Sequence, residues 1–158
     1  MKYIEQSLYN QFLENLPISC VDIALIAQGK ILLVKRNDPP ARGQWWIPGG
    51  RVLKNELMKD TAKRKAIEEV GIECHVGPII HTAETIFPDG PSNIQVHTIN
   101  TCFFVYPVHS NVSAKLDNHH IDYMWVECIP KEVHSYVRDC LLKAGLDYQK
   151  VTNYGKKL

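Results

Sequence analysis

Cysteine is scarce in this sequence, and the cysteines that occur are far apart. The chain has five among its 158 residues, an odd number, and they form no C-x-x-C pair and no short cluster with histidine. This spacing argues against a disulfide framework and against a zinc site. We therefore predict reduced thiols, as in a cytosolic protein, at Cys20, Cys74, Cys102, Cys128 and Cys140.

The sequence also lacks an excess of charge of either sign and any apolar run as long as a membrane span. It has 18 Lys and Arg against 17 Asp and Glu, which gives a formal net charge of +1. Such a balance creates no overall field that would attract nucleic acid or a membrane, so any anion must be bound locally. Residues 1–17 contain Glu5 and Glu14 and lack the apolar segment of a signal peptide. We expect a cytoplasmic protein whose partners include neither nucleic acid nor membrane.

Hydrophobic periodicity predicts one α+β domain over residues 1–158. Apolar positions repeat at helical spacing near both ends and in the middle of the chain, and β-branched runs lie between them. We expect helices at 3–15, Glu56–Glu69 and from Pro130 onward, strands at Val21–Ala27, Ile31–Lys35, Trp45–Ile47, His75–Phe87, Ile94–Tyr106 and Tyr123–Glu127, and a frayed tail from Lys150. This order of elements predicts a mixed β-sheet between helices, an α/β/α sandwich.

The most informative segment is residues 49–72, which reads GGRVLKNELMKDTAKRKAIEEVGI. A glycine turn precedes a predicted helix that gathers acidic and basic side chains at regular intervals. On that helix Arg64 is expected to pair with Glu68, and Lys65 with Glu69. Carboxylates beside a backbone carbonyl are the hard oxygen ligands that Mg²⁺ prefers. The alternative is a solvated charged helix, which we disfavour because seven spaced positions fit a metal–diphosphate site at once.

Those spaced positions resemble the Nudix box, G-x5-E-x7-R-E-U-x-E-E-x-G-U with U aliphatic, through Gly50, Glu56, Arg64, Glu68, Glu69, Gly71 and Ile72. The resemblance implies a Nudix hydrolase fold and a divalent-metal site. One position departs from the pattern, because Lys65 stands where the family has glutamate. In ordinary members that glutamate often acts as general base or helps to hold metal. Lys65 therefore either inactivates the protein or requires a base from another segment.

The neighbouring residues His119 and His120 are candidates for the missing base. They are followed by an acidic residue just before a predicted strand, on a loop of the kind that often carries catalytic groups. Neutral imidazole accepts a proton near neutral pH and also ligates metals. The alternative is a pair of exposed loop histidines without a role.

Cationic residues gather around the start of the box. Arginine forms bidentate bonds with phosphate oxygens, so such a group would suit a diphosphate. The alternative is a set of ordinary surface cations, which we favour for Arg42 and consider for Lys35. We expect Arg36 and Arg51 to be functional, with Lys35 as a further candidate for substrate binding.

Within the Nudix family, residues 15–130 are similar to the GDP-mannose mannosyl hydrolase branch. The similarity is carried by the segment 40–52, PARGQWWIPGGRV, and by residues 120–125, HIDYMW. It implies attack of water at the sugar carbon C1, which releases GDP and the free hexose with inversion. It also implies roles for single residues: His120 as general base, Arg36 as the group that helps GDP to leave, Asp22 as an acid in the site, Arg51 as a diphosphate contact, and Glu69 with the Gly49 carbonyl as metal ligands.

Two positions leave the metal preference open. The branch has glutamine just before its histidine base, whereas this chain has His119, and imidazole suits Mn²⁺ better than Mg²⁺. The chain also has Glu68, which supplies a second carboxylate as in ordinary Nudix enzymes. We expect Mg²⁺ as cofactor with Mn²⁺ as an alternative, held by Gly49, Glu68, Glu69 and His119.

Three functions are therefore compatible with the sequence. The first is hydrolysis of a nucleotide sugar of the GDP-mannose or GDP-glucose type at carbon. The second is an ordinary Nudix pyrophosphohydrolase that cleaves the diphosphate of a nucleoside diphosphate derivative. The third is a catalytically inactive ligand sensor. The apolar N-terminal helix and the family resemblance together predict a homodimer.

Overall fold

The computed structural model describes residues 4–110 and 112–148. Residue 3 of the predicted first helix and the predicted tail from Lys150 lie outside this range. The helices are α1 (Gln6–Asn15), α2 (Met58–Val70), the 3₁₀ turn η1 (Pro91–Asn93) and α3 (Ser135–Lys143). The strands are β1 (Ile18–Ala27), β2 (Lys30–Arg36), β3 (Trp45–Trp46), β4 (Gly49–Arg51), β5 (Cys74–Phe87), β6 (Val96–Pro107) and β7 (His120–Val126).

The strands form one mixed sheet with the order β3-β2-β1-β6-β5, in which β4 also pairs with β1 and β7 with β2. The central pair β1 and β6 is parallel, and the other pairs are antiparallel. Both faces of the central strands are buried, which explains why β1 and β2 are almost continuously apolar.

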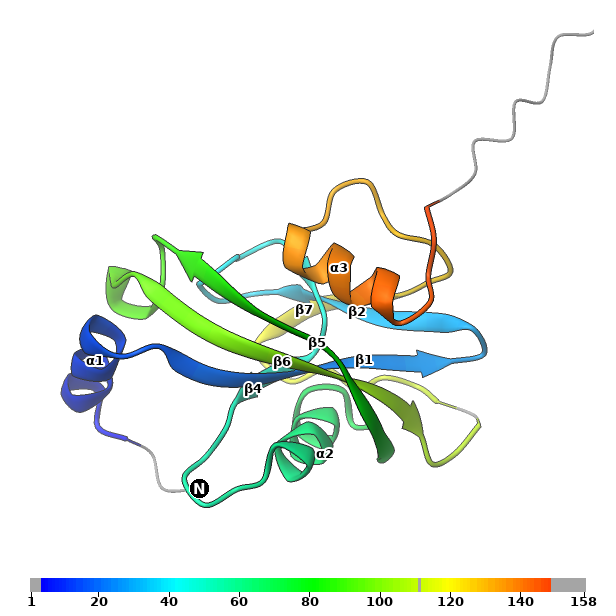
Figure 1. The fold of residues 1–158 in the computed structure, drawn as a ribbon, viewed down its shortest axis with the longest axis horizontal. Helices are drawn as coiled ribbons and strands as arrows, with labels where there is room; N and C mark the ends of the chain where they lie inside the picture. The colour runs from blue at the N-terminus through cyan, green and yellow to red at the C-terminus, as the bar shows by residue number, and fades with distance from the viewer. Residues whose placement is uncertain (1–3, 111, 149–158) are drawn as a thin grey trace, which may run out of the picture.

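The helices α2 and α3 cover opposite faces of this sheet (Figure 1). Neighbouring residues alternate between two cores, as a strand requires. On β2, Ile31 and Leu33 pack in the core that contains α3, whereas Leu32 and Val34 pack in the core that contains α2. The helix α1 lies apart from α2 and α3, at one end of the sheet. The predicted α+β fold, an α/β/α sandwich, is confirmed.

The box helix begins later than predicted, at Met58 instead of Glu56. Asn55 has a positive φ of 67°, so the chain turns before the helix starts. The carboxylate of Glu56 lies outside the helix and accepts hydrogen bonds from the backbone N–H of Leu53 and the hydroxyl of Thr61. Glu56 therefore closes the turn in front of α2 and is not part of it.

Several other boundaries also differ from the prediction; β1, for example, begins at Ile18 instead of Val21. The last helix begins at Ser135 and not at Pro130, because the ring of His134 accepts a hydrogen bond from the backbone N–H of Tyr136 and caps the helix there. The last strand begins at His120 and not at Tyr123, since β2 extends far enough to pair with it. His120 consequently lies on the sheet and not on a loop.

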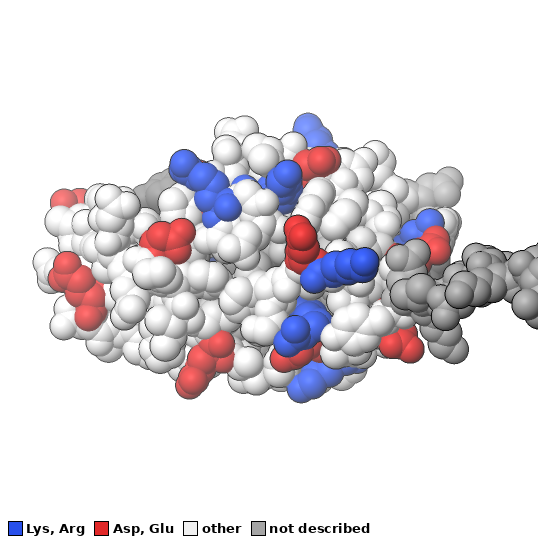
Figure 2. Space-filling model, turned by 90° about the horizontal axis from the view of Figure 1, so that it is seen from above, with Lys and Arg blue, Asp and Glu red and all other residues white. Residues whose placement is uncertain are grey.

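The distribution of surface charge and the state of the cysteines agree with what the composition predicted. On the face in Figure 2, positive and negative side chains are interspersed. All five cysteines carry free thiols, as predicted. Within the described ranges no helix has both the length and the apolar character needed to cross a membrane.

Candidate active site

A cavity of about 540 Å³ opens where β1, β2, β4, α2 and the start of β7 meet. Most of the residues singled out from the sequence line it: Asp22, Arg36, Gly49, Arg51, Glu69, His119 and His120. Lys65 also lines the cavity. Lys35 and Glu68, which were predicted to bind substrate and metal, do not belong to its wall.

A β-bulge brings Arg36 and His120 together. Along β2 and β7, Lys35 pairs with Asp122 but Arg36 pairs with His120, so that Ile121 is the extra residue. Such a bulge reverses the side on which the following side chains lie. Arg36 is further fixed by its Nε–H, which donates to the carbonyl of Pro40 at 2.7 Å. The predicted base and the predicted leaving-group cation thus share one wall of the cavity.

His120 is almost completely buried and is held by a carboxylate. Its Nδ1 lies 2.8 Å from Oδ1 of Asp117, and its side chain is 4% exposed. Because an ionised carboxylate only accepts hydrogen bonds, Nδ1 is the donor, and in a neutral ring the lone pair is then on Nε2. Nε2 is 3.8 Å from Oε2 of Glu69, beyond hydrogen-bonding distance. This arrangement suits a neutral imidazole that accepts a proton.

The neighbouring His119 is placed very differently. Its side chain is 69% exposed, and its Nδ1 contacts Oδ2 of Asp38 at the rim of the cavity. The prediction that His119 joins Glu69 and Glu68 as a metal ligand remains untested by this arrangement, in which its nearest acidic partner is Asp38. Of the two alternatives for the histidine pair, the exposed loop residue describes His119 and the buried site residue describes His120.

Asp22 lies at the floor of the cavity, opposite Gly49 in the β1–β4 pairing. The hydroxyl of Tyr136, from α3, donates to its Oδ2 at 2.7 Å. Burial raises the pKa of Asp22 to about 7, although the Tyr136 hydrogen bond opposes this rise. The strands approach so closely that a Cβ on Gly49 would lie 2.2 Å from Oδ1 of Asp22. Glycine is therefore required at position 49 by packing.

The carboxylate of Glu69 is buried at the end of α2, with both oxygens engaged. Oε2 accepts the backbone N–H of Gly49 at 3.0 Å, and Oε1 lies 2.7 Å from Nζ of Lys65. Glu68 is more exposed and pairs with Arg64 at 3.0 Å and with Lys65 at 3.3 Å. Both ion pairs predicted on this helix are confirmed.

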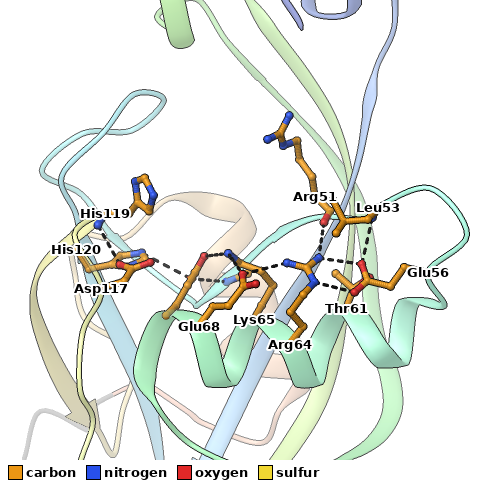
Figure 3. Close-up of polar contacts among 12 residues, drawn as sticks. Arg51, Leu53, Glu56, Thr61, Arg64, Lys65, Glu68, Asp117, His119 and His120 are labelled. Atoms are coloured by element: carbon orange, nitrogen blue, oxygen red, sulfur yellow. Dashed lines mark hydrogen bonds and ion pairs between the residues drawn. The ribbon is translucent and has the colours of Figure 1, made fainter. Parts of the chain in front are cut away.

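Arg64 joins the turn before α2 to the helix itself (Figure 3). Its Nε and Nη2 donate to the two carboxylate oxygens of Glu56 at 2.7 and 2.8 Å, and Nη2 also donates to the carbonyl of Arg51. The hydrogen bonds from Arg64 lower the pKa of Glu56 to about 2. The Glu56–Arg64 pair thus stabilises the segment that carries Gly49 and Arg51. Neither side chain of the pair lines the cavity.

The donors around Glu69 fit a hard divalent cation. Within residues 4–110 and 112–148, no three side chains of His, Cys, Asp or Glu gather as a ready-made metal cluster. The carboxylates of Glu68 and Glu69 nevertheless hold a cation, because the ammonium group of Lys65 lies between them. Carboxylate and carbonyl oxygens suit an ion such as Mg²⁺, which keeps several of its waters.

Some of the aromatic and cationic side chains line the cavity, and others lie outside it. Trp46 is largely buried and packs against Phe87, with ring centroids 5.7 Å apart, and both line the cavity. Arg51 also lines it, with its guanidinium 4.3 Å from the ring centroid of Tyr9 in α1. Lys35 instead places its Nζ 5.7 Å from the ring of Trp45. Tyr9 was not foreseen, and neither were Asp38, Asp117 and Tyr136.

The sequence and fold resemble known proteins. Residues 17–129 match a family model described as the NUDIX domain. The low-salt glycan biosynthesis protein Agl8 of Haloferax volcanii is 34% identical over 127 residues, which cover 78% of this chain and 79% of that protein. The ADP-ribose pyrophosphatase of Methanocaldococcus jannaschii is 24% identical over 115 residues, 73% of this chain and 66% of that protein.

A solved structure supports the same assignment of the fold. The crystal structure of a MutT NUDIX hydrolase from Burkholderia pseudomallei superposes with a TM-score of 0.69 at 21% identity. The superposition covers 82% of this chain and 98% of that chain. At this level of identity the likeness concerns the fold alone.

Proposed function

This chain belongs to the NUDIX hydrolase family, and from that premise we propose that it hydrolyses a nucleotide sugar of the GDP-mannose or GDP-glucose type to GDP and free hexose. Members of the family generally use a divalent metal such as Mg²⁺ or Mn²⁺. In this proposal a single domain over residues 1–158 carries the activity, and water attacks the anomeric carbon of the sugar, not phosphorus.

One observation carries the proposal. The glutamate that often serves as base in the family is replaced by Lys65, whereas the buried His120, held by Asp117, faces the same cavity as Arg36. An ammonium group does not accept a proton at neutral pH, so a base must come from another element. The lone pair on Nε2 of His120 supplies one.

The reaction then proceeds with defined roles for these side chains. Nε2 of His120 takes a proton from water as the water oxygen bonds to C1. The bond between C1 and the diphosphate oxygen breaks, and its electron pair leaves with GDP. Arg36 stabilises the negative charge that develops on the departing diphosphate. Asp22 lies beside this path as a buried acid whose pKa is about 7, a value suited to holding or releasing a proton near neutrality.

The remaining groups hold the substrate and the metal. We assign Mg²⁺, or Mn²⁺ as an alternative, to Glu69 and the carbonyl of Gly49, with Glu68 and His119 as further candidate ligands. When bound, the ion neutralises negative charge on the diphosphate. Arg51 is assigned to the diphosphate as well. Lys35 is a weaker candidate, because its ammonium group lies over Trp45, outside the cavity.

A second function is favoured by the retained carboxylates. Glu68 and Glu69 are both present, as in Nudix enzymes that attack phosphorus, and the Methanocaldococcus relative is described as an ADP-ribose pyrophosphatase. In that alternative the chain would cleave the diphosphate of a nucleoside diphosphate derivative. The name of the Haloferax relative, a glycan biosynthesis protein, agrees better with a nucleotide sugar as substrate.

Hydrolysis of GDP-mannose with Mg²⁺ in ¹⁸O-labelled water, followed by phosphorus NMR, distinguishes the two reactions. Attack at carbon yields GDP without label in its phosphates and hexose labelled at C1. Attack at phosphorus yields GMP and mannose 1-phosphate, one of which carries the label. The second result would replace the proposal with the alternative. Absence of turnover on any nucleotide diphosphate, with retained binding, would favour a ligand sensor.

We also propose a cytoplasmic homodimer. The helix α1 and the residue after it expose apolar side chains, with Leu8 43% and Leu16 56% exposed. Burial of such side chains against a second copy would remove them from water. Light scattering at micromolar concentration should give twice the mass of the chain, and a monomer would contradict this proposal.

A further inference from the structure

The ammonium group of Lys65 lies where the box gathers its negative charge. Its Nζ is 2.7 Å from Oε1 of Glu69 and 3.3 Å from Oε2 of Glu68. Figure 3 shows Lys65 beside Glu68 on α2, and Lys65 and Glu69 both line the cavity. Lys65 therefore neutralises the same oxygens that the proposed function assigns to a divalent ion.

The side chain is held in this position by packing and not only by charge. A Cβ on Gly50 would lie 2.8 Å from Cε and 3.3 Å from Nζ of Lys65, so the end of the lysine chain rests directly on this glycine. The Lys65 side chain is 14% exposed and that of Glu69 is 7% exposed. An ion pair so sheltered from water is screened much less than a surface pair on a helix.

We propose that Lys65 is a tethered counter-ion of Glu69 that competes with the divalent ion for this carboxylate. The inference rests on the metal site of the proposed function. Glu69 has two oxygens, and one of them already accepts the backbone N–H of Gly49. A divalent ion that binds the other oxygen is repelled by the ammonium group, which already lies 2.7 Å from it. In the absence of metal, Lys65 thus neutralises the buried carboxylate of Glu69. The same ion pair weakens the binding of a divalent ion.

Metal binding in the absence of nucleotide tests this competition directly. Free Mn²⁺ is measured by electron paramagnetic resonance during titration of the full chain, for wild type and for Lys65→Met, Lys65→Arg and Lys63→Met. Lys63 is an exposed lysine on the same helix. It therefore controls for the general effect of removing one positive charge. Thermal unfolding followed by circular dichroism verifies that each variant is folded.

We expect Lys65→Met to bind Mn²⁺ at least about tenfold more tightly than wild type, because removal of a competing ligand strengthens binding by mass action. Lys65→Arg keeps a competing cation and should resemble wild type, as should Lys63→Met. Unchanged or weaker binding in Lys65→Met would overturn the inference.

Glu69→Gln identifies the site at which this competition occurs. It should weaken Mn²⁺ binding and abolish the gain produced by Lys65→Met. Binding that does not depend on Glu69 in either background would overturn both the assigned metal site and the competition. The reaction itself is decided separately, by the labelled products from GDP-mannose.

Discussion

The carboxylate of Asp117 lies 2.8 Å from Nδ1 of His120 and determines which imidazole nitrogen faces the cavity. The same Asp117 oxygen accepts the backbone N–H of His119 at 3.0 Å, so it also orders the start of β7. The backbone N–H of Asp117 in turn donates to the carbonyl of Glu69. One residue therefore couples the end of the box helix to the proposed base.

Asp117→Asn should lower kcat for GDP-mannose by about 10- to 100-fold, a smaller loss than that of His120→Ala, because the base remains but its tautomer and orientation are no longer fixed. Steady-state kinetics measures the effect. Asp122→Asn, which changes an exposed carboxylate on β7 that does not line the cavity, serves as the matched control and should change kcat little. Full activity of Asp117→Asn would contradict the orienting role.

The Glu56–Arg64 pair predicts a dependence of stability on acid. The pKa of Glu56 is lowered from 4.5 to about 2 by Arg64, so its contribution to stability is complete above pH 4.5 and is lost as the pH falls towards 2. At pH 7, Glu56→Gln should lower the free energy of unfolding by about 2–3 kcal/mol.

Urea unfolding of wild type and Glu56→Gln between pH 7 and pH 2 tests this contribution. The difference between the two proteins should be constant down to pH 4.5 and shrink below it. Since Glu56 lies outside the cavity, substrate affinity at neutral pH should change less than stability. A difference that persists unchanged at pH 2 would contradict the role of this ion pair.

The two glycines of the turn before the box should respond differently to alanine. A Cβ on Gly49 would meet the backbone of Val21 and the buried carboxylate of Asp22, neither of which has room to move. A Cβ on Gly50 would meet only the end of the Lys65 side chain, which is flexible. Gly49→Ala should therefore cost about 1–3 kcal/mol of stability through overpacking, and Gly50→Ala clearly less.

Thermal unfolding of the two variants side by side measures this contrast. Gly50→Ala also displaces the end of the Lys65 side chain, which packs against this glycine. The variant should therefore fold, but its affinity for Mn²⁺ should differ from that of wild type. Equal stability of the two variants would show that the β1–β4 approach is looser than the structure indicates.

The sequence predicted the parts of this site that depend on short-range spacing. Arg64 with Glu68 and Lys65 with Glu69 pair as helical neighbours do, and the apolar, β-branched runs and the helical spacing of apolar residues identified the sheet and the layers of helices. Lys35 does not line the cavity, since alternating sides along a strand separate it from Arg36, and its role in substrate binding stays a prediction.

Other contacts join segments that are remote in the chain and carry no local pattern. Tyr136 meets Asp22 across 114 residues, and His119 meets Asp38 across 81. Such partners are determined by how α3 and the loop after β2 dock on the sheet. The bulge that brings His120 opposite Arg36 is similarly a property of strand pairing, which requires the three-dimensional structure.

At the Tyr136–Asp22 contact, the effect of burial on the pKa of Asp22 can be separated from the effect of the hydrogen bond. Burial is the larger influence and raises the pKa of Asp22 to about 7, while the hydroxyl of Tyr136 lowers it. Tyr136→Phe removes only the second influence, so the pKa of Asp22 should rise further. A titration of the Asp22 carboxyl carbon by ¹³C NMR in metal-free protein measures this shift, and an unchanged or lower pKa would contradict it.

Stability supplies an independent test of the same contact. Because the folded-state pKa of Asp22 exceeds its ordinary value of 3.8, the unfolded chain releases this proton first, and the contribution of Asp22 to stability falls as the pH rises from about 4 to about 7. Tyr136→Phe should extend this fall to higher pH, since the ionised carboxylate has lost a donor. Asp22→Asn should abolish it, because an amide does not ionise. If the pH dependence survives in Asp22→Asn, another buried group is responsible, and the assignment of a near-neutral acid to the floor of the cavity fails.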